Sequence, residues 1–379
     1  MGSNVVISNF IGQDNKKGIY AAVETSIIIA VFSGFFLIIV GEIFAPMILK
    51  WMGVPDKVFE MAELYLRIYI AGMPMVLLYN FEAAIFRSRG NTRTPLIVLT
   101  ISGIINVVLN LFFVVVCKMT VEGVALATVI ANGLSAFILF IKLRRDNSDI
   151  GISSVKLHFD IKIMKRIFVI GIPAGLQGTI FSFSNIIIQS AINSLGADAM
   201  AGSAAGFNIE IIVYFIVNAY GQACTTFTGQ NYGAGNPFRC KRSLRLCMLQ
   251  MAIVCILACS LILIFGHVLL SFFNDNPEVI EYGFVRMKYI LTFEVLNGVM
   301  EVLSGCMRAF GHSLAPALVT LIGVCAVRII WVYTIFNVYH SFEILIITYP
   351  VSWMITVTAL IAAYFHMKKT SLREFFETE

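Results

Sequence analysis

The segment RSRGNTRTP at residues 87–95 recurs as RAFGHSLAP at residues 308–316, with Arg, Gly and Pro at unchanged spacing. Glycine and proline have positional meaning at helix ends and turns, so matches at these residues indicate equivalent chain reversals. The sequence therefore predicts two copies of one pattern that run in the same direction, offset by 221 positions. The same offset relates further pairs across residues 12–126 and 233–347: Gly12 with Gly233, Asn15 with Asn236, Val58 with Val279 and Glu60 with Glu281.

The composition is that of a membrane protein. Of the 379 residues, 59% are hydrophobic and 13% are charged, against about 45–50% and about 25% in soluble domains. A helix that crosses a bilayer needs roughly 20 apolar residues, and stretches of that length fill the chain. The pattern predicts an all-α polytopic membrane protein with ten full spans, at about residues 20–49, 59–86, 94–116, 121–143, 162–193, 200–228, 243–270, 282–306, 314–338 and 343–367.

The positive charge of the chain marks its topology. The formal net charge is +5, which could indicate an anionic partner such as nucleic acid. However, the loops on one side of the predicted membrane carry twenty Lys and Arg, whereas the alternate loops carry three. This asymmetry follows the positive-inside rule. It predicts a multi-pass protein of the cell membrane with a cytoplasmic C-terminus and no nucleic-acid partner.

Two same-direction repeats in a membrane protein predict two helical lobes related by an axis along the membrane normal, with a transport site between them. The second copy has two spans ahead of its first repeat glycine, whereas the first copy has only residues 1–11 there. We therefore expect that about sixty residues of copy one are missing, so that the first lobe lacks its first helix and about half of its second. The predicted domains are an incomplete N-terminal lobe with a partial helix and four spans (1–143), a cytoplasmic interlobe linker (144–161), a C-terminal lobe of six spans (162–367) and a cytoplasmic tail (368–379).

Acidic side chains within the spans are the candidates for binding a coupling proton or cation, because an ionisable group in a bilayer is costly and by default functional. The second half supplies Glu210, Glu294 and Glu301. Glu210 is preferred because polar residues follow it at every fourth position along one helix face. Neither Glu210 nor Glu294 has an obvious cationic partner in the sequence. For Glu301, a purely structural pair with Arg328 is the alternative.

Uncharged polar residues extend the candidate site. In the first half, Asn106 and Asn110 lie one helical turn apart and complete the coupling set. Polar stripes on several spans predict a shared hydrated cavity, although amides also hold membrane helices together without further function. The candidate substrate cavity is lined by Gln177, Tyr214, Asn218, Gln222 and Arg328.

Motifs for metal binding or catalysis are absent from the sequence. The eight cysteines form no CxxC pair, no HExxH segment occurs, and the five histidines are scattered at span ends and loops. An intramembrane enzyme would need a clustered nucleophile and base, or a metal set. We therefore expect neither enzymatic activity nor a cofactor, apart from Na⁺ or H⁺ as a coupling ion.

Four segments resemble the multidrug and toxic compound extrusion (MATE) family of efflux transporters, bacterial type: Asn9–Gly12, Arg87–Pro95, Gly171–Gln177 and Thr228–Asn236. The resemblance covers essentially the whole chain. It implies two six-helix lobes that open alternately to either side of the membrane and export cationic or amphipathic organic compounds in exchange for Na⁺ or H⁺. On this resemblance the chain is an N-terminally truncated member that acts as a monomer in the lipid bilayer.

The resemblance also bears on individual positions. Asn106 and Asn110 match a first-lobe site at which some relatives have Asn and Asp, and Phe181 and Ser182 stand where some relatives have an acid. A second-lobe site would therefore depend on the three glutamates. Two alternatives stay open. A lipid-linked oligosaccharide flippase of related architecture would need a strongly cationic cavity, whereas Lys and Arg within the spans are few here; the other alternative is a non-transporting truncated remnant.

Overall fold

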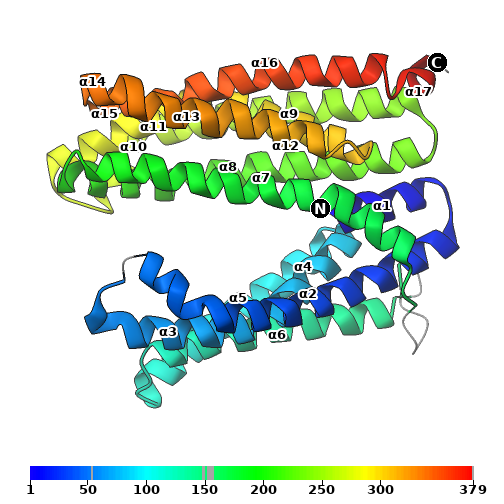
Figure 1. The fold of residues 1–379 in the computed structure, drawn as a ribbon, viewed down its shortest axis with the longest axis horizontal. Helices are drawn as coiled ribbons and strands as arrows, with labels where there is room; N and C mark the ends of the chain where they lie inside the picture. Colours follow the sequence, from blue (N-terminus) through cyan, green and yellow to red (C-terminus); the bar gives the residue numbers. More distant parts are fainter. Residues whose placement is uncertain (53, 147–149, 152–157, 378–379) are drawn as a thin grey trace. The chain divides into compact units, whose positions relative to one another are not determined.

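The structure, a computed structural model, describes residues 1–52, 54–146, 150–151 and 158–377. Within these residues the chain is almost entirely helical and contains no strand (Figure 1). Segments η1, η2 and η3 are π-helical. The elements are α1 (Gly2–Gly12), α2 (Lys16–Trp51), α3 (Asp56–Ala71), α4 (Met73–Ser88), α5 (Arg93–Leu111), η1 (Phe112–Val116), α6 (Val121–Arg144), α7 (Ile161–Asn193), α8 (Ala197–Gly233), α9 (Pro237–Ile264), α10 (Gly266–Ser271), α11 (Pro277–Ala309), α12 (Leu314–Thr320), η2 (Leu321–Ala326), α13 (Val327–Trp331), η3 (Val332–Phe336), α14 (Asn337–Tyr339), α15 (Phe342–Ile346), α16 (Thr348–Lys369) and α17 (Arg373–Glu377).

Nine helices of the described chain are long and apolar enough to cross a membrane, and ten if α3 and α4 count as one span. This confirms the predicted all-α polytopic membrane protein. The expected continuous span at 59–86 is wrong in detail, because α3 and α4 meet at a 45° bend. Pro74 lies in the first turn of α4, where it has no N–H to give to the preceding turn, so the helix breaks at Gly72. The expected span at 243–270 likewise divides into α9 and the short α10.

The two copies of the repeat have equivalent helix ends. α1 ends at Gly12 and α8 ends at Gly233, the paired glycines. The helices that follow, α2 and α9, are each capped by the repeat asparagine. The side-chain oxygens of Asn15 and Asn236 each accept a hydrogen bond, 2.9 Å long, from the backbone N–H three residues further on. Asparagine is favoured there because it satisfies an N–H that the first helical turn leaves without a partner.

The segment RSRGNTRTP and its copy form equivalent turns. The connection between α4 and α5 occupies residues 89–92, and its counterpart between α11 and α12 occupies residues 310–313. Gly90 and Gly311 have φ angles of +85° and +87°. Residues that carry a side chain rarely adopt this conformation, whereas glycine adopts it readily. Both copies therefore have glycine at this position because the turn requires a positive φ angle.

The described chain divides into two compact units. The first holds nearly all of α1, then α2 to α6 and the start of α7 as far as Ile167. The second begins at Phe168 and holds the rest of α7 and the helices that follow. The described residues of the predicted linker at 144–161 lie within the first unit. Its residues 147–149 and 152–157 lie outside the described residues.

The start of α7 is attached to α2 by hydrogen bonds. The backbone N–H groups of His158 and Asp160 donate to side chains of α2 at 2.8 and 3.1 Å. Asp160 in turn caps α7, since its Oδ1 accepts from the backbone N–H groups of Ile163 and Lys162 at 3.1 and 2.8 Å. These two bonds hold the pKa of the Asp160 carboxyl below its usual range. The first turn of α7 therefore belongs to the first unit.

In the second unit, α8 and α11 lie against each other over most of their length. Glycines allow this close approach: a Cβ on Gly202 would collide with the backbone at Val279, and a Cβ on Gly305 would collide with the backbone at Gly221. Small residues let membrane helices approach closely and gain van der Waals contact, which matters where lipid removes the usual hydrophobic driving force. The close approach brings polar side chains of α8 next to those of α11.

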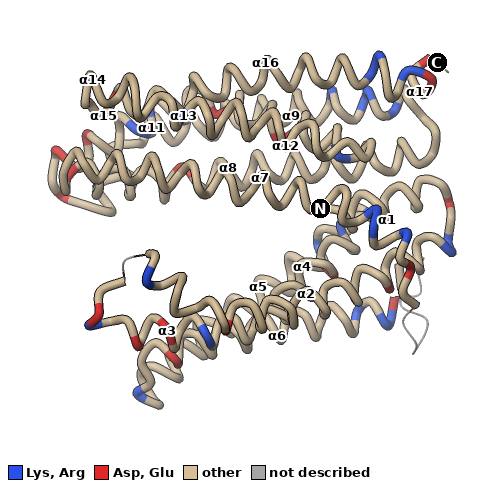
Figure 2. The backbone as a smooth tube through the Cα atoms, in the orientation of Figure 1, with Lys and Arg blue, Asp and Glu red and all other residues tan. Residues whose placement is uncertain are grey.

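Large apolar side chains cover the outside of the described helices. Phe32, Ile104, Ile212 and Ile264 are among many that are more than half exposed. Lys and Arg gather near the helix ends, with long uncharged stretches between them (Figure 2). An apolar band between charged ends fits a bilayer.

The predicted tail at 368–379 is partly structured. The short helix α17 follows α16, and the ring of Phe376 packs against Phe310 with 5.9 Å between ring centroids. Residues 378–379 lie outside the described residues. The described part of the tail therefore packs onto the core of the second unit.

Candidate functional site

Buried charge in the second unit is concentrated on α11. Arg286, Glu294 and Arg308 are 4%, 4% and 3% exposed, and the side chain of Glu301 is 14% exposed. A charged group in an apolar medium is costly unless it is paired or hydrogen-bonded. When it persists, it marks a functional candidate. The partners of these four residues therefore decide what the site can do.

Glu210 of α8 and Arg286 of α11 form a buried ion pair. The Nη2 and Nε atoms of Arg286 both donate to Oε2 of Glu210, at 2.9 and 3.2 Å. The Nη1 atom donates to the hydroxyl of Ser203 at 3.1 Å. The guanidinium also lies 5.5 Å from the ring centroid of Tyr349. Charge-assisted bonds of this kind are among the stronger hydrogen bonds in proteins. The other oxygen of Glu210, Oε1, is buried and accepts no hydrogen bond from the described residues.

The expectation that Glu210 has no cationic partner is wrong. Its partner Arg286 is 76 positions away in the sequence, and only the close contact of α8 with α11 brings the two together. A cation that binds to Glu210 would have to compete with a fixed guanidinium, and a proton there would leave the guanidinium uncompensated. Glu210 remains a candidate member of the site, but it is poorly placed to bind and release an ion by itself.

Arg328 lies within the helix packing, between the π-helical segments η2 and η3. It is 1% exposed. Its guanidinium donates to Asn185 of α7 and to Ser352 of α16, at 3.2 Å in both cases, and lies 4.1 Å from the ring centroid of Tyr349. Its hydrogen-bond partners are therefore neutral. π-helical turns within α-helices occur frequently at functional positions.

The expected pair of Glu301 with Arg328 is wrong. Glu301 instead lies 3.9 Å from Arg308, two turns further along the same helix. The guanidinium of Arg328 is instead bonded to Asn185 of α7 and Ser352 of α16. Sequence spacing identified the residues as buried charges but could not identify which of them meet.

Glu294 differs from the other buried acids of this unit. It accepts one hydrogen bond, from Nδ2 of Asn297 at 2.7 Å. In the described chain no Lys or Arg nitrogen comes within 4.0 Å of its carboxylate. A carboxyl in this setting can take up a proton, and with the neighbouring amide oxygen it can contact a monovalent cation. Among the described residues, no group of three or more His, Cys, Asp or Glu side chains could hold a metal ion.

The residues expected to line a substrate cavity fall into two groups. Gln177 is buried and fixed: its Nε2 donates to Thr320 at 3.2 Å, and its Oε1 accepts from Arg308 at 3.5 Å. Arg328, described above, is likewise enclosed.

The second group forms a more accessible polar stripe on α8, made of Tyr214, Asn218 and Gln222. Tyr214 is 42% exposed, and Nε2 of Gln222 donates to Oδ1 of Asn218 at 2.6 Å.

Asn106 and Asn110 lie on α5, in the first unit. Nδ2 of Asn110 donates to Oδ1 of Asn106 at 3.1 Å, and Nδ2 of Asn106 donates to Thr128 of α6 at 3.4 Å. The chain of bonds thus connects two neighbouring helices, as polar residues in membrane helices often do. Oδ1 of Asn110 is buried and accepts no hydrogen bond from the described residues.

Glu82 on α4 is a buried acid outside the candidate residues selected from the sequence. Its side chain is 0% exposed, and neither carboxylate oxygen has a hydrogen-bond partner among the described residues. The signal lies in the repeat, because the counterpart of Glu82 at the offset of 221 positions is Leu303, a buried apolar residue. An acid at a position that the other copy fills with leucine is costly, which makes it a functional candidate.

The helix that carries Glu82 packs against α6. A Cβ on Gly72 would touch Val129, and one on Gly133 would lie 3.7 Å from Met75. Residues next to the start of α4 thus contact α6, and the described helices α4 and α6 pack against each other.

Replacing Glu82 with Leu, the residue of the other copy, is expected to raise the free energy of unfolding by roughly 1–3 kcal/mol, because a buried carboxyl without a partner is removed. Thermal unfolding of the purified protein in detergent micelles, followed by tryptophan fluorescence, measures the change. The matched control is Glu60→Leu, at an exposed position on α3, which is expected to change stability little. A lower unfolding temperature for Glu82→Leu would contradict this description of the site.

Comparison with known proteins places this arrangement among membrane transporters. The family model MatE matches residues 1–112 and 173–334, well over half of the chain. The chain is 26% identical over 372 residues to "Probable multidrug resistance protein YoeA" of Bacillus subtilis, which covers 96% of this chain and 80% of that protein. It is 24% identical over 334 residues to "Probable multidrug resistance protein NorM" of Thermotoga maritima, which covers 87% of this chain and 72% of that protein.

A solved structure has the same fold. The crystal structure of a mutant of the Vibrio cholerae MATE transporter VcmN aligns with a TM-score of 0.88 and 20% sequence identity, over 97% of this chain and 84% of that one. At this identity the likeness concerns the fold alone.

Proposed function

This chain belongs to the MatE family, and from that membership we propose that it is a secondary active multidrug efflux antiporter. It exports cationic or amphipathic organic compounds in exchange for Na⁺ or H⁺, by alternating access. It is a multi-pass membrane protein and not an enzyme. In this proposal it acts as a monomer in the plasma membrane, with a cytoplasmic C-terminus, as the distribution of Lys and Arg indicates.

The observation that supports the proposal is that the carboxyl of Glu294 is buried without a close cationic partner among the described residues. A carboxyl buried in the middle of a span, held by one amide and by no close cation, costs stability that a purely structural role would not explain. Glu294 is proposed to bind and release the coupling ion. Glu210 and Glu301 complete the coupling set of the second unit, where each is paired with an arginine.

We propose that the charge balance among the buried ionisable groups of the second unit supplies the coupling. When the three acids and the three arginines are all ionised, their charges cancel; they are Glu210, Glu294, Glu301, Arg286, Arg308 and Arg328. A proton or Na⁺ on Glu294 gives these six groups a net charge of +1. In a medium of low dielectric constant this charge repels a cationic substrate, and its release attracts one. Ion and substrate therefore compete, and each biases the equilibrium between the open states by its differential affinity.

The polar stripe on α8 is proposed to contact the substrate. Tyr214 presents an aromatic ring, which attracts organic cations, and the amides of Asn218 and Gln222 supply hydrogen bonds. Gln177 and Arg328 support the site from within the helix packing.

In the first unit, Asn106 and Asn110 are proposed as further ion-binding groups. Glu82 of α4 is a separate candidate, because its carboxyl is buried and has no hydrogen-bond partner among the described residues.

The test is transport by the purified chain in proteoliposomes. Ethidium, a fluorescent organic cation, is placed on one side, and either a pH gradient or a Na⁺ gradient is imposed. We expect ethidium to move against its own gradient when one of the two ion gradients is present, and the active gradient identifies the coupling ion. No ion-driven movement of ethidium or of a panel of other organic cations would contradict antiport.

The same proteoliposomes can be used to test whether the protein is instead a lipid-linked oligosaccharide flippase. A fluorescent lipid-linked oligosaccharide is added to the membrane, and its exposure on the outer leaflet is followed by chemical quenching. We expect no acceleration over vesicles without protein, because two of the three buried arginines of the second unit are compensated by Glu210 and Glu301. Rapid flipping without ethidium transport would favour the alternative.

A further inference from the structure

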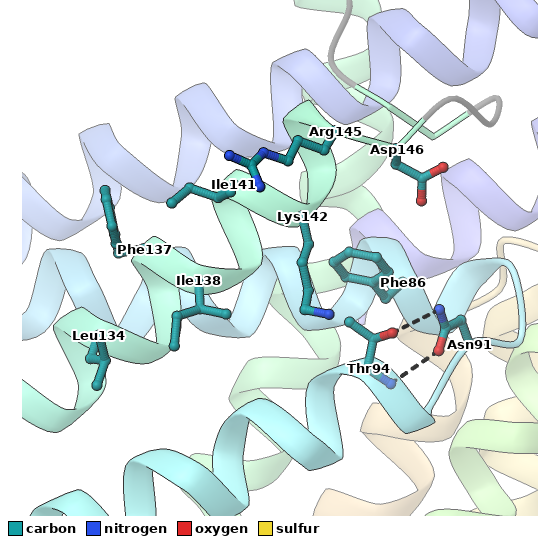
Figure 3. Close-up of a pocket in the computed structure, with 10 residues that line it drawn as sticks. All are labelled: Phe86, Asn91, Thr94, Leu134, Phe137, Ile138, Ile141, Lys142, Arg145 and Asp146. Atoms are coloured by element: carbon teal, nitrogen blue, oxygen red, sulfur yellow. Dashed lines mark hydrogen bonds between the residues drawn. The ribbon is translucent and has the colours of Figure 1, made fainter.

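An open groove lies within the first unit, where α4, α5 and α6 meet (Figure 3). Its volume is about 640 Å³. None of its residues belongs to the coupling set or to the substrate stripe. The lining residues are Phe86, Asn91, Thr94, Leu134, Phe137, Ile138, Ile141, Lys142, Arg145 and Asp146.

One wall of the groove is a stripe of α6 that changes character along its length. Leu134, Phe137, Ile138 and Ile141 follow one another at the three- and four-residue steps that keep side chains on one helix face. The ring of Phe137 is 61% exposed, so the stripe is open to an apolar occupant. From Leu134 to Ile141 the helix rises roughly 10 Å, which fits within the hydrocarbon part of one bilayer leaflet.

The same wall ends in positive charge. Lys142 lies in the last turn of α6 and Arg145 directly follows the helix. Both are exposed, and both line the groove. They lie at the end of a membrane-spanning helix, where lipid headgroups meet water. A pocket that is apolar toward the membrane centre and cationic at its edge has the charge distribution that an anionic lipid requires.

Uncharged donors complete the polar end. Asn91 and Thr94 bond to each other: Thr94 N donates to Oδ1 of Asn91 at 3.1 Å, and Nδ2 of Asn91 donates to the Thr94 hydroxyl at 3.0 Å (Figure 3). These bonds fix the start of α5 beside the groove. Asp146 also lines the groove. The lining therefore holds two cations and one anion, and its net charge is positive.

We propose that this groove binds one anionic glycerophospholipid. An acyl chain lies along the apolar stripe of α6, and the phosphodiester lies between Lys142 and Arg145, with the hydroxyl of Thr94 as a further donor. Selectivity for anionic over zwitterionic lipid follows from the net positive lining, because the positive end of a zwitterionic headgroup would meet an excess of positive charge. On the positive-inside topology, this lipid belongs to the cytoplasmic leaflet.

Native mass spectrometry of the purified protein, titrated with phosphatidylglycerol or phosphatidylcholine, tests the proposal. We expect one phosphatidylglycerol to remain bound at energies that remove phosphatidylcholine. The Lys142→Gln and Arg145→Gln variants are each expected to weaken that binding by roughly fivefold. The matched control is Arg144→Gln, which removes the same charge from an exposed neighbour outside the groove lining and is expected to retain binding.

Two further measurements distinguish binding of a whole lipid from binding of a simple anion. Glycerophosphoglycerol, the headgroup without acyl chains, is expected not to displace the bound lipid at millimolar concentration. The Ile138→Ser variant, which disrupts the apolar wall without changing charge, is expected to lower the affinity for phosphatidylglycerol. Equal loss of binding with Arg144→Gln, equal retention of both lipids, or displacement by the free headgroup would each overturn the proposal.

Discussion

Replacing Glu294 with Gln is expected to abolish the dependence of ethidium export on the ion gradient while the protein stays folded. Gln has nearly the same size and can still accept the hydrogen bond from Asn297. However, an amide does not take up a proton at the pH of the transport assay, and it offers no negative charge to Na⁺. We therefore expect export in proteoliposomes with an ion gradient to fall to the rate measured without one, a loss of roughly fivefold or more.

The matched control for this variant is Glu281→Gln. Glu281 lies on the same helix, but its side chain is 65% exposed, so its neutralisation is expected to leave export unchanged. Thermal unfolding of both variants in detergent confirms that differences in transport do not come from misfolding. If Glu294→Gln exports ethidium at the wild-type rate under the same gradient, Glu294 is not the coupling residue.

Replacing Glu210 with Leu is expected to lower the free energy of unfolding by about 3–5 kcal/mol, because the change leaves Arg286 buried without its carboxylate. The reverse single change, Arg286→Met, leaves Glu210 uncompensated and is expected to cost a similar amount. The double variant removes both charges together. Since apolar residues of similar volume often replace a buried ion pair without loss, we expect it to recover most of the stability.

Thermal or denaturant unfolding of the two single variants and the double variant gives the interaction energy directly. The control cycle uses Arg373 and Glu377, an exposed pair at 2.6 Å on α17 with side chains 68% and 61% exposed. Exposed pairs contribute little to stability, so that cycle is expected to show almost no interaction. A double variant of Glu210 and Arg286 that is as unstable as the sum of its single variants would show that the two side chains act independently.

The helix ends, helix caps and turns of this fold were predictable from local sequence. The paired glycines end α1 and α8, the paired asparagines cap α2 and α9, and Gly90 and Gly311 adopt positive φ angles. Each of these features depends on the conformational preference of one residue and its near neighbours. A same-direction repeat makes these features visible, because both copies form the same helix ends and turns and keep the same residues there. The bend between α3 and α4 was less visible, since a single proline leaves the position and angle of a break open.

The partners of the buried charges were not predictable in the same way. Glu210 meets Arg286 and Arg328 meets Asn185 only because glycine-mediated packing and helix order bring distant segments together. Spacing along one helix suggested instead that Glu210 had no cation and that Glu301 paired with Arg328. Glu82 is visible in the sequence as an acid within a span, but its lack of a partner is a property of the packed structure. Its apolar counterpart Leu303 was the remaining signal in the sequence.

The most direct test of the central claim, that Glu294 holds the coupling ion, is to measure ion release when substrate binds. Ethidium is added to the purified protein in weakly buffered detergent solution, and released protons or Na⁺ are followed with a pH indicator and a Na⁺-selective electrode. The account predicts that the wild type releases an ion on binding ethidium, and that Glu294→Gln binds ethidium and releases none. Release of the same amount of ion by Glu294→Gln and by the wild type would contradict it.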